Sequence, residues 1–501
     1  MQRAARLSPA AAFAVGTLVF GALAAHVLAM HYHEDQALFR WARILGVSDA
    51  AHLRFEDFGL IYPHVPFYLL LPFRFLPGLD TPAAPYLLSV LATGLLLALW
   101  TRHLARAGLA PGSALWLGLP VLLQPALVRA ATTGGTLALG LLFLYALHRS
   151  MVRMATRGDI RAFIVLGGTL ALYFFTDALS VHLFLALLPL LVLVVPERIL
   201  RDSPLSVYVI LATPLVVAAG SWAYLNWIFE GDFLQFLAAP GSAYRGGWQQ
   251  VPDLPWLARY GGTWWAAFGA AAVRLFLCYP VLLPLLLAAR RHGAHGRALF
   301  AFCLLLPAAT AFATAQNYLR HPDDLLGLAA AAVMAELALL PESRRPGWRL
   351  AFVLALLAGA GYGWYDYAHD RGPVIRPWQQ ALAGHPQTPP PAGALALGRW
   401  LAREREETLI DERSAYHVIA ARGDARGLVL SFDERFKLAL RRRLPDLRQI
   451  AVPDPHSPAG HRDGILARFP HLYDRGLPGY VRVYDRLGWR VYRRREPGEA
   501  S

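Results

Sequence analysis

Long apolar runs are the feature that most constrains this 501-residue chain. Crossing a hydrocarbon layer of about 30 Å takes about 20 helical residues, because a helix satisfies its backbone amides internally. About eleven stretches come near that requirement. They cover residues 8–30, 83–100, 112–128, 132–148, 162–176, 180–196, 205–228, 268–289, 298–316, 323–340 and 350–367. The sequence therefore predicts a mainly α-helical, polytopic membrane protein with about eleven transmembrane helices.

Composition supports this fold class and excludes others. Hydrophobic residues make up 56% of the chain and charged residues 16%, which excludes a disordered protein. The net charge of +14 comes from arginines in short stretches between apolar runs, not from one basic patch, so we expect no nucleic-acid partner. Cys278 and Cys303 both lie within apolar runs and lack metal-ligand spacing, which predicts neither a disulfide nor a zinc site.

The arginines also predict the orientation, because positive loops stay on the cytoplasmic side. Six basic connections fall on one side of the predicted bundle: "MQRAAR", "TRHLAR", "HRSMVRMATRGDIR", "PERILRD", "RRHGAHGR" and "PESRRPGWR". The opposite short connections carry only Arg129 and Arg320. The N-terminus is therefore predicted to be cytoplasmic, and residues after about 368 are predicted to lie outside.

Three regions follow from this topology. Residues 1–370 are the predicted transmembrane domain, with a large first outer loop at 31–82. Residues 371–395 form a Pro-rich linker containing "GHPQTPPPAG", and residues 396–501 form a soluble periplasmic α/β domain. In that domain "TLIDE", "GLVLS" and "RQIAV" indicate strands, and "YVRVYDRLGWRVYRR" indicates a terminal hairpin. It has no glycine-rich phosphate loop, so no cofactor is assigned to it.

The first outer loop opens with "HYHEDQALF", which places Glu34 and Asp35 directly after the first apolar run. A carboxylate at this boundary suits general-base chemistry, because partial desolvation raises its proton affinity. The alternative is that the pair only caps the following helix, a role worth about 0.3–1 kcal/mol. That helix carries Leu38, Trp41 and Leu45 on one stripe, which is typical of a helix lying on a membrane surface.

The layout resembles the GT-C superfamily of lipid-phosphosugar-dependent glycosyltransferases, which includes bacterial protein O-mannosyltransferases and aminoarabinose transferase-like proteins. Three segments carry the resemblance: the acidic pair followed by "FGLIYPHVPFYLLLPF", then "YLNWIFEGDFLQFLAAPGSAY", and then "NYLRHPDDLLGLAAAAVMAEL". Family members have a D-E motif at the first helix end. Here the order is Glu34-Asp35, which leaves open which of the two is catalytic.

The resemblance implies an activity, a location and two partners. It implies transfer of a sugar from a polyprenyl-phosphate donor, within membrane lipid, to a cell-envelope glycan, lipid or protein acceptor. It also implies the periplasmic face of a bacterial inner membrane. The chemistry needs a carboxylate that deprotonates or orients the acceptor hydroxyl, and cations that stabilise the phosphate leaving group. Asp35 and Glu34 are the candidates for the first role.

Arg320 and Arg129 are the candidates for phosphate binding, since a planar guanidinium suits phosphate oxygens. The alternatives are a salt bridge from Arg320 to Asp323 or Asp324, and simple snorkelling of Arg129. Beside them, Asp177 and His182 flank another outer turn, where a structural pair is favoured over substrate contact.

Four further residues of the first loop are candidate site residues. Tyr62 and His64 are assigned to the substrate-binding site, where Pro63 and the prolines that follow it interrupt the next helix. Glu56 and Asp57 could hold a divalent metal ion or the acceptor, against the alternative of solvated loop acids. No cofactor is certain and the metal is left unknown.

Two other classes of protein remain open. A secondary transporter would show an internal repeat and charges at the midplane, and neither is evident. A non-catalytic subunit of a cell-envelope polysaccharide assembly system would keep its partners after the acids were neutralised. An enzyme would instead lose turnover.

Overall fold

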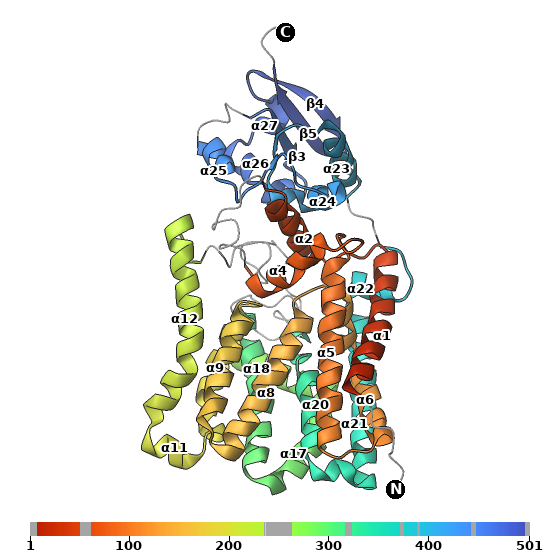
Figure 1. Cartoon of the computed structure of the whole chain (residues 1–501), viewed down its shortest axis with the longest axis vertical. Coiled ribbons are helices and arrows are strands. Elements are labelled where there is room, and N and C mark those ends of the chain that lie inside the picture. Colours follow the sequence, from red (N-terminus) through yellow and green to blue (C-terminus); the bar gives the residue numbers. More distant parts are fainter. Residues whose placement is uncertain are drawn as a thin grey trace. The chain divides into compact units, whose positions relative to one another are not determined.

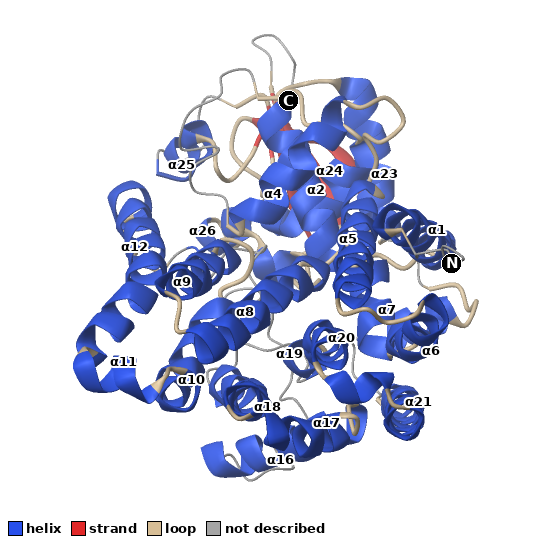
Figure 2. Cartoon of the chain, turned by 60° about the horizontal axis from the view of Figure 1, so that its bottom comes forward, coloured by secondary structure: helices blue, strands red, loops and turns tan. Residues whose placement is uncertain are grey.

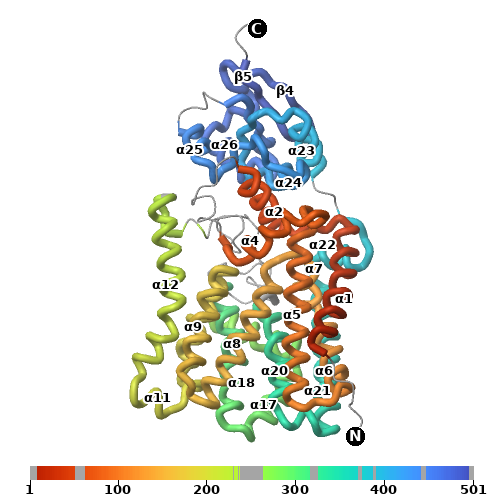
Figure 3. The backbone as a smooth tube through the Cα atoms, viewed as in Figure 1, coloured from red at the N-terminus to blue at the C-terminus, as the bar shows by residue number. Residues whose placement is uncertain are grey.

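The computed structural model describes residues 8–50, 62–234, 236, 263–315, 323–370, 375–387, 391–441 and 447–495. The chain forms two compact units. Unit 1 comprises residues 1–30, 62–66 and 86–385, and unit 2 comprises residues 31–61, 67–85 and 386–501. Figures 1 and 3 follow the chain through both units. Unit 2 thus contains most of the predicted first outer loop together with the C-terminal residues.

The regular secondary structure in the described residues of unit 1 consists of helices. Its helices are α1 (Pro9–Ala29), α5 (Ala84–Arg106), α6 (Pro111–Leu122), α7 (Pro125–Thr132), α8 (Leu137–Arg157), α9 (Ile160–Phe174), α10 (Leu179–Val194), α11 (Glu197–Asp202), α12 (Pro204–Glu230), α16 (Trp264–Cys278), α17 (Leu282–Ala289), α18 (Ala294–Ala315), α19 (Asp323–Leu326), α20 (Ala329–Leu339), α21 (Pro346–His369) and α22 (Ile375–Leu382), with 3-10 turns η2 (Arg290–His292) and η3 (Pro341–Arg344). Helix α4 (His64–Leu70) begins in unit 1 and ends in unit 2. Helix α8 lies centrally, packed against α9, α18 and α20 (Figure 2).

The described helices define a multi-pass membrane protein. Five of them are long and apolar enough to cross a membrane: α1, α5, α8, α12 and α18. The α6–α7 pair is bent by 75° and the pair formed by α16 and α17–η2 by 92°, and counting each pair as one span gives seven. Helices α9, α10 and α20 are apolar but shorter. Helix length and composition therefore support five to seven crossings among the described residues, fewer than the number predicted from the sequence.

The helix breaks within unit 1 leave backbone carbonyls that neighbouring side chains satisfy. Gln124, between α6 and α7, donates from Nε2 to the carbonyl of Cys278 at 3.3 Å. Tyr279, between α16 and α17, donates its hydroxyl to the carbonyl of Gly327 at 3.3 Å, where α19 and α20 separate. A broken helix in lipid needs such partners, because no water reaches its free carbonyls.

One carboxylate joins three helices inside unit 1. Glu336 on α20 has no exposed surface. Its Oε1 lies 2.5 Å from Nε2 of His148 on α8, and its Oε2 lies 2.7 Å from Nε2 of His295 on α18. Two ring nitrogens therefore face the two oxygens of one buried carboxylate, which offsets the cost of burying it.

Unit 2 contains a small mixed sheet. Its helices are α2 (Asp35–Ser48), α23 (Ala392–Glu404), α24 (Glu412–Arg422), α25 (Glu434–Arg441), α26 (Gly464–Arg468) and α27 (Leu472–Arg475), with 3-10 turns η1 (Leu71–Phe75) and η4 (Gly460–Arg462). Its strands are β1 (Thr408–Leu409), β2 (Leu428–Val429), β3 (Gln449–Pro453), β4 (Tyr480–Arg486) and β5 (Trp489–Arg494).

The strand order is β2-β1-β3-β5-β4. Strands β2, β1 and β3 are parallel, joined through α24 and α25, and β5 and β4 continue the sheet antiparallel. The terminal hairpin turns at Leu487 and Gly488, which have φ of 50° and 78°. Positive φ at both central residues matches the twist of a two-residue hairpin.

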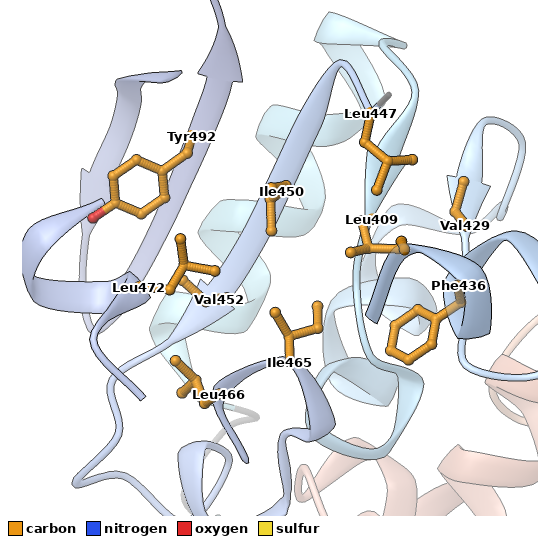
Figure 4. Close-up of a cluster of buried hydrophobic side chains, with 11 residues drawn as sticks. Leu409, Val429, Phe436, Leu447, Ile450, Val452, Ile465, Leu466, Leu472 and Tyr492 are labelled. Atoms are coloured by element: carbon orange, nitrogen blue, oxygen red, sulfur yellow. The ribbon is translucent and has the colours of Figure 1, made fainter. Parts of the chain in front are cut away.

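A hydrophobic cluster lies between this sheet and the helices that follow the strands (Figure 4). Ile450 and Val452 of β3 are fully buried, and Phe436 of α25 and Ile465 of α26 pack into the same cluster. The other members shown are Leu409, Val429, Leu447, Leu466, Leu472 and Tyr492. The flanking helices cover the apolar side chains of the sheet, which strands of two residues could not bury by themselves.

Helix α2 is part of unit 2 and packs along α24. Leu38, Trp41 and Leu45 are at most 5% exposed. Arg43 forms an ion pair with Glu412 at the start of α24, and its guanidinium lies 4.3 Å from the Phe432 ring. The apolar stripe predicted for a membrane surface is therefore covered by protein.

Candidate active site

The segment that leads into α2 has a fixed geometry. His31 adopts a φ of 60°, in the left-handed region. Tyr32 is 5% exposed, and its hydroxyl donates to Oε2 of Glu34 at 2.7 Å. Glu34 occupies the N-cap position of α2, but its side chain makes no capping hydrogen bond to the helix backbone. Its carboxylate is therefore turned toward Tyr32 instead of the helix end.

Asp35 is the first residue of α2 and faces α24. Its Oδ1 lies 3.6 Å from Nε2 of His417, and the Asp35 side chain is 37% exposed. It also hydrogen-bonds to the phenol of Tyr416, which in turn hydrogen-bonds to Arg462. Asp35 thus combines access to solvent with positioned neighbours, which is what a proton-accepting carboxylate needs.

The pKa values around Asp35 reflect burial and charge. Burial, and then the negative charge of Asp35, raises the pKa of Tyr416, so this phenol stays protonated and donates. Burial, and then the nearby charges of His417 and His31, lowers the pKa of His33. The His33 imidazole is therefore harder to protonate than a free one.

A second acidic pair lies in unit 2, at the ends of β1 and η4. Asp411 caps α24 by accepting from the Arg413 amide, and it also accepts from the Gly464 amide at 2.7 Å. Asp463 caps α26 and accepts from the Ser414 hydroxyl at 2.6 Å. Burial, and then the charge of Asp411, raises the pKa of Asp463 to about 7. Backbone amides donate to both carboxyl groups, so we interpret this pair as structural: it connects the starts of α24 and α26.

Tyr62 and His64 lie in an aromatic cluster of unit 1. The Tyr62 hydroxyl donates to the Phe174 carbonyl at 2.7 Å, and its ring centroid lies 5.0 Å from that of Phe236. The His64 ring lies 4.0 Å from that of Trp222. Burial lowers the pKa of His64 to about 4, so this imidazole is neutral near pH 7.

Arg129 and Asp177 belong to unit 1. Arg129 on α7 is 6% exposed, which disfavours a guanidinium that snorkels to the interface. Asp177 accepts from the Thr136 hydroxyl at 3.1 Å and from the Leu179 amide at 3.0 Å, at the start of α10. Asp177 therefore ties the start of α10 to the turn before α8, and His182 is buried on α10 itself.

Three predicted site residues lie outside the described residues: Glu56, Asp57 and Arg320. Within the part of the chain that the structure describes, no group of three or more His, Cys, Asp or Glu side chains is arranged to hold a metal ion.

Sequence reasoning missed His417, Tyr416 and Arg462. The segment "SAYHVIAARG" does predict a helix, and α24 confirms it. No spacing signal connects that helix with Asp35, because the two segments are separated by most of the chain.

The fold defines a class of protein: a multi-pass helical membrane protein with a small C-terminal mixed-sheet region. Among solved structures it matches the crystal structure of ArnT from Cupriavidus metallidurans in the apo state. The match has a TM-score of 0.50 and 14% sequence identity, and it covers 95% of this chain and 97% of that chain. No family model and no curated protein sequence matches. The resemblance predicted from the sequence is thus confirmed at the level of the fold.

Proposed function

We propose that the protein is a GT-C-type glycosyltransferase that moves a sugar from a polyprenyl-phosphate donor to a cell-envelope acceptor. The observation that carries the proposal is Asp35, a partly exposed carboxylate beside His417 and Tyr416, in a chain with the ArnT-like fold. Such a carboxylate suits deprotonation of an acceptor hydroxyl.

The reaction assigns one role to each group. Asp35 takes the proton of the acceptor hydroxyl as the acceptor oxygen bonds to the sugar's anomeric carbon. The bond from that carbon to the phosphate oxygen breaks, and its electron pair leaves with the lipid phosphate. Glu34, which accepts a hydrogen bond from the Tyr32 hydroxyl, adds a second negative charge beside Asp35. We assign phosphate binding to Arg129 and Arg320, substrate contact to Tyr62 and His64, and acceptor or metal binding to Glu56 and Asp57.

The proposed setting follows from the arginine distribution. We propose a bacterial inner-membrane protein with about eleven crossings, a cytoplasmic N-terminus and a periplasmic reaction face. The proposed domains are 1–370 for the transmembrane part, 371–395 for the linker and 396–501 for the periplasmic α/β domain. We propose that residues 31–61 and 67–85, which belong to the same compact unit as residues 386–501, are periplasmic as well.

The described helix breaks give no support to transport. In a transporter, interrupted helices surround the substrate. Here the residues at the breaks, including Gln124, Tyr279 and Gly327, line a cavity of about 10 Å³. That volume holds about one water molecule, which is too small for a transported solute in this conformation.

The test is transfer by the purified full-length protein with a panel of polyprenyl-phosphate sugars, followed by release of the lipid phosphate. We expect Asp35→Asn to lower kcat at least about 100-fold, because general-base catalysis contributes about 10²–10⁴-fold. Glu34→Gln reports which acid is the base, and Asp474→Asn, at a 70% exposed side chain, is the matched control. Release that is unchanged in both Asp35→Asn and Glu34→Gln would refute the mechanism.

A further inference from the structure

We propose that His417 is the positioning residue for Asp35: it holds this carboxylate oriented and ionised so that it accepts the acceptor's proton. The inference deepens the proposed glycosyl transfer and rests on it. It assigns helix α24 of the C-terminal region a direct part in the chemistry of the first outer loop, within one compact unit.

His417 presents one ring nitrogen, Nε2, to Asp35. Its Nε2 lies 3.6 Å from Oδ1 of Asp35, and its side chain is 17% exposed. Its ring lies against the ring of Tyr416, with centroids 4.3 Å apart. Within the described residues its Nδ1 is buried without a hydrogen-bond partner. The carboxylate of Asp35 is therefore the charged group toward which the accessible ring nitrogen points.

The position of His417 is fixed by the fold of unit 2. Helix α24 begins at a capped N-terminus, where Asp411 accepts from the Arg413 amide at 3.0 Å. The same helix is tied to α2 by the ion pair between Arg43 and Glu412. Phe39 of α2 meets the Tyr416 ring edge-on, with centroids 6.1 Å apart. Asp35 and His417 are thus carried by two helices that are fastened to each other.

The other titratable groups around this pair set the sign of its effect. His33 acts on it from the segment before α2, Tyr416 from α24 itself, and Arg462, which hydrogen-bonds to Tyr416, from η4. His33 loses proton affinity through burial first and then through His417. Of the ring nitrogens of this cluster, Nε2 of His417 is the one that lies 3.6 Å from the Asp35 carboxylate.

A charged imidazole beside Asp35 has a defined consequence for the reaction. It favours the ionised carboxylate, so Asp35 remains able to accept a proton at lower pH. The acceptor's proton moves to Asp35, and the sugar–phosphate bond breaks with its electrons leaving on the lipid phosphate. Asp35 then returns the proton to water. His417 orients Asp35 throughout and does not contact the sugar in this proposal.

The first test measures the pair without any reaction. The full-length protein is labelled with ¹⁵N-histidine in detergent, and the His417 signals are assigned by NMR through their loss in His417→Gln. At one fixed pH we expect Asp35→Asn to move the ¹⁵N signal of His417 Nε2, which lies 3.6 Å from the Asp35 carboxylate, whereas Asp474→Asn should leave it in place. A His417 signal that does not respond to Asp35→Asn would overturn the proposal.

The second test follows kcat/KM against pH for lipid phosphate release. We expect His417→Gln to move the acidic limb up by about half a unit, with about a threefold loss at low pH that disappears at high pH. KM should not change. His417→Lys, which keeps a positive charge, should return the limb toward the wild-type position, whereas His471→Gln at an exposed site should not move it.

The outcomes separate this proposal from the one it rests on. If Asp35→Asn abolishes transfer but the limb of His417→Gln coincides with wild type, His417 has no positioning role and the glycosyltransferase assignment stands. If the His417 NMR signal responds to Asp35→Asn but wild-type protein transfers no sugar from any donor, the contact between the two side chains exists and both the transfer and the role of His417 in it are overturned.

Discussion

Glu336 and Asp35 each face a histidine, and the surroundings of the two carboxylates differ in almost every other respect. Glu336 in unit 1 has no exposed surface and is approached by His148 and His295 at 2.5 and 2.7 Å. Asp35 in unit 2 has a side chain that is 37% exposed, and His417 lies 3.6 Å away. The same pair of chemical groups thus occurs once in a buried site with short contacts, and once in a partly exposed site with a longer contact.

From this difference we expect a structural role for Glu336 and, under the proposed function, a chemical role for Asp35. A carboxylate enclosed by two ring nitrogens has no room for a substrate, and removing it leaves buried polar groups without their partner. A carboxylate that water reaches can exchange protons. A partner at a longer distance can influence the charge of that carboxylate without blocking access to it. We therefore expect substitutions at Glu336 to change stability and substitutions at Asp35 to change turnover.

Glu336→Leu is expected to give the largest effect. It leaves the buried His148 and the 13% exposed His295 without the carboxylate, and breaking a buried ion pair costs about 3–5 kcal/mol. Thermal unfolding of the detergent-solubilised full-length protein would show a lowered Tm, whereas Asp35→Asn should leave Tm unchanged.

The control for Glu336 is a weaker pair of the same kind. His292 and Glu342 are 3.1 Å apart, but His292 is 32% exposed, so Glu342→Gln should cost about 1 kcal/mol or less. Replacing His148, His295 and Glu336 together by apolar residues should recover part of the loss, because well-packed hydrophobic groups replace buried ion pairs at little cost. Equal Tm for Glu336→Leu and wild type would contradict the comparison.

Asp463 sharpens the comparison, since it is a buried carboxyl that faces another carboxyl, Asp411, instead of a histidine. Its pKa of about 7 means that the folded protein holds this proton up to about pH 7. The unfolded chain releases it near pH 4. Folded protein therefore binds more protons between these values, so the stabilising contribution is complete below about pH 4, falls as pH rises to about 7 and is constant above.

The expected fall in the stability of unit 2 is on the order of 1–4 kcal/mol. Pulse proteolysis in urea at about pH 5, 6, 7 and 8 would measure it in the full chain. Asp463→Asn keeps the cap of α26 and should remove this part of the pH dependence. A variant whose stability still falls with pH as steeply as wild type would show that another group titrates there.

The sequence predicts those parts of the fold that depend on local patterns. The stretch 205–228 corresponds to α12 at Pro204–Glu230, because a long apolar run has one way to satisfy its amides in lipid. The hairpin at Leu487 and Gly488 follows from turn chemistry. The stretch 323–340 is instead two helices, α19 and α20, because hydropathy does not register where backbone hydrogen bonds are interrupted.

The candidate site was predictable in part. The position of Asp35 at the start of a helix follows from the sequence, and α2 confirms that helix. The amphipathic stripe of α2 indicates that one face is buried, but an apolar face fits lipid and protein equally well, so α24 as its partner was not predictable. His417 comes with α24, and its contact with Asp35 depends on that tertiary packing.

His64 provides the smallest expected effect and the sharpest contrast with His417. Its ring lies 4.0 Å from that of Trp222, and burial holds its pKa at about 4. Because a neutral imidazole carries no charge to lose between about pH 5 and 8, His64→Gln should lower kcat/KM by less than about threefold and leave the shape of its pH profile unchanged. The measurement is the same lipid phosphate release that tests His417. The acidic limb could instead move in His64→Gln as it is expected to move in His417→Gln. Proximity to a carboxylate would then not be what distinguishes the two histidines, and the comparison between buried and exposed sites would be wrong.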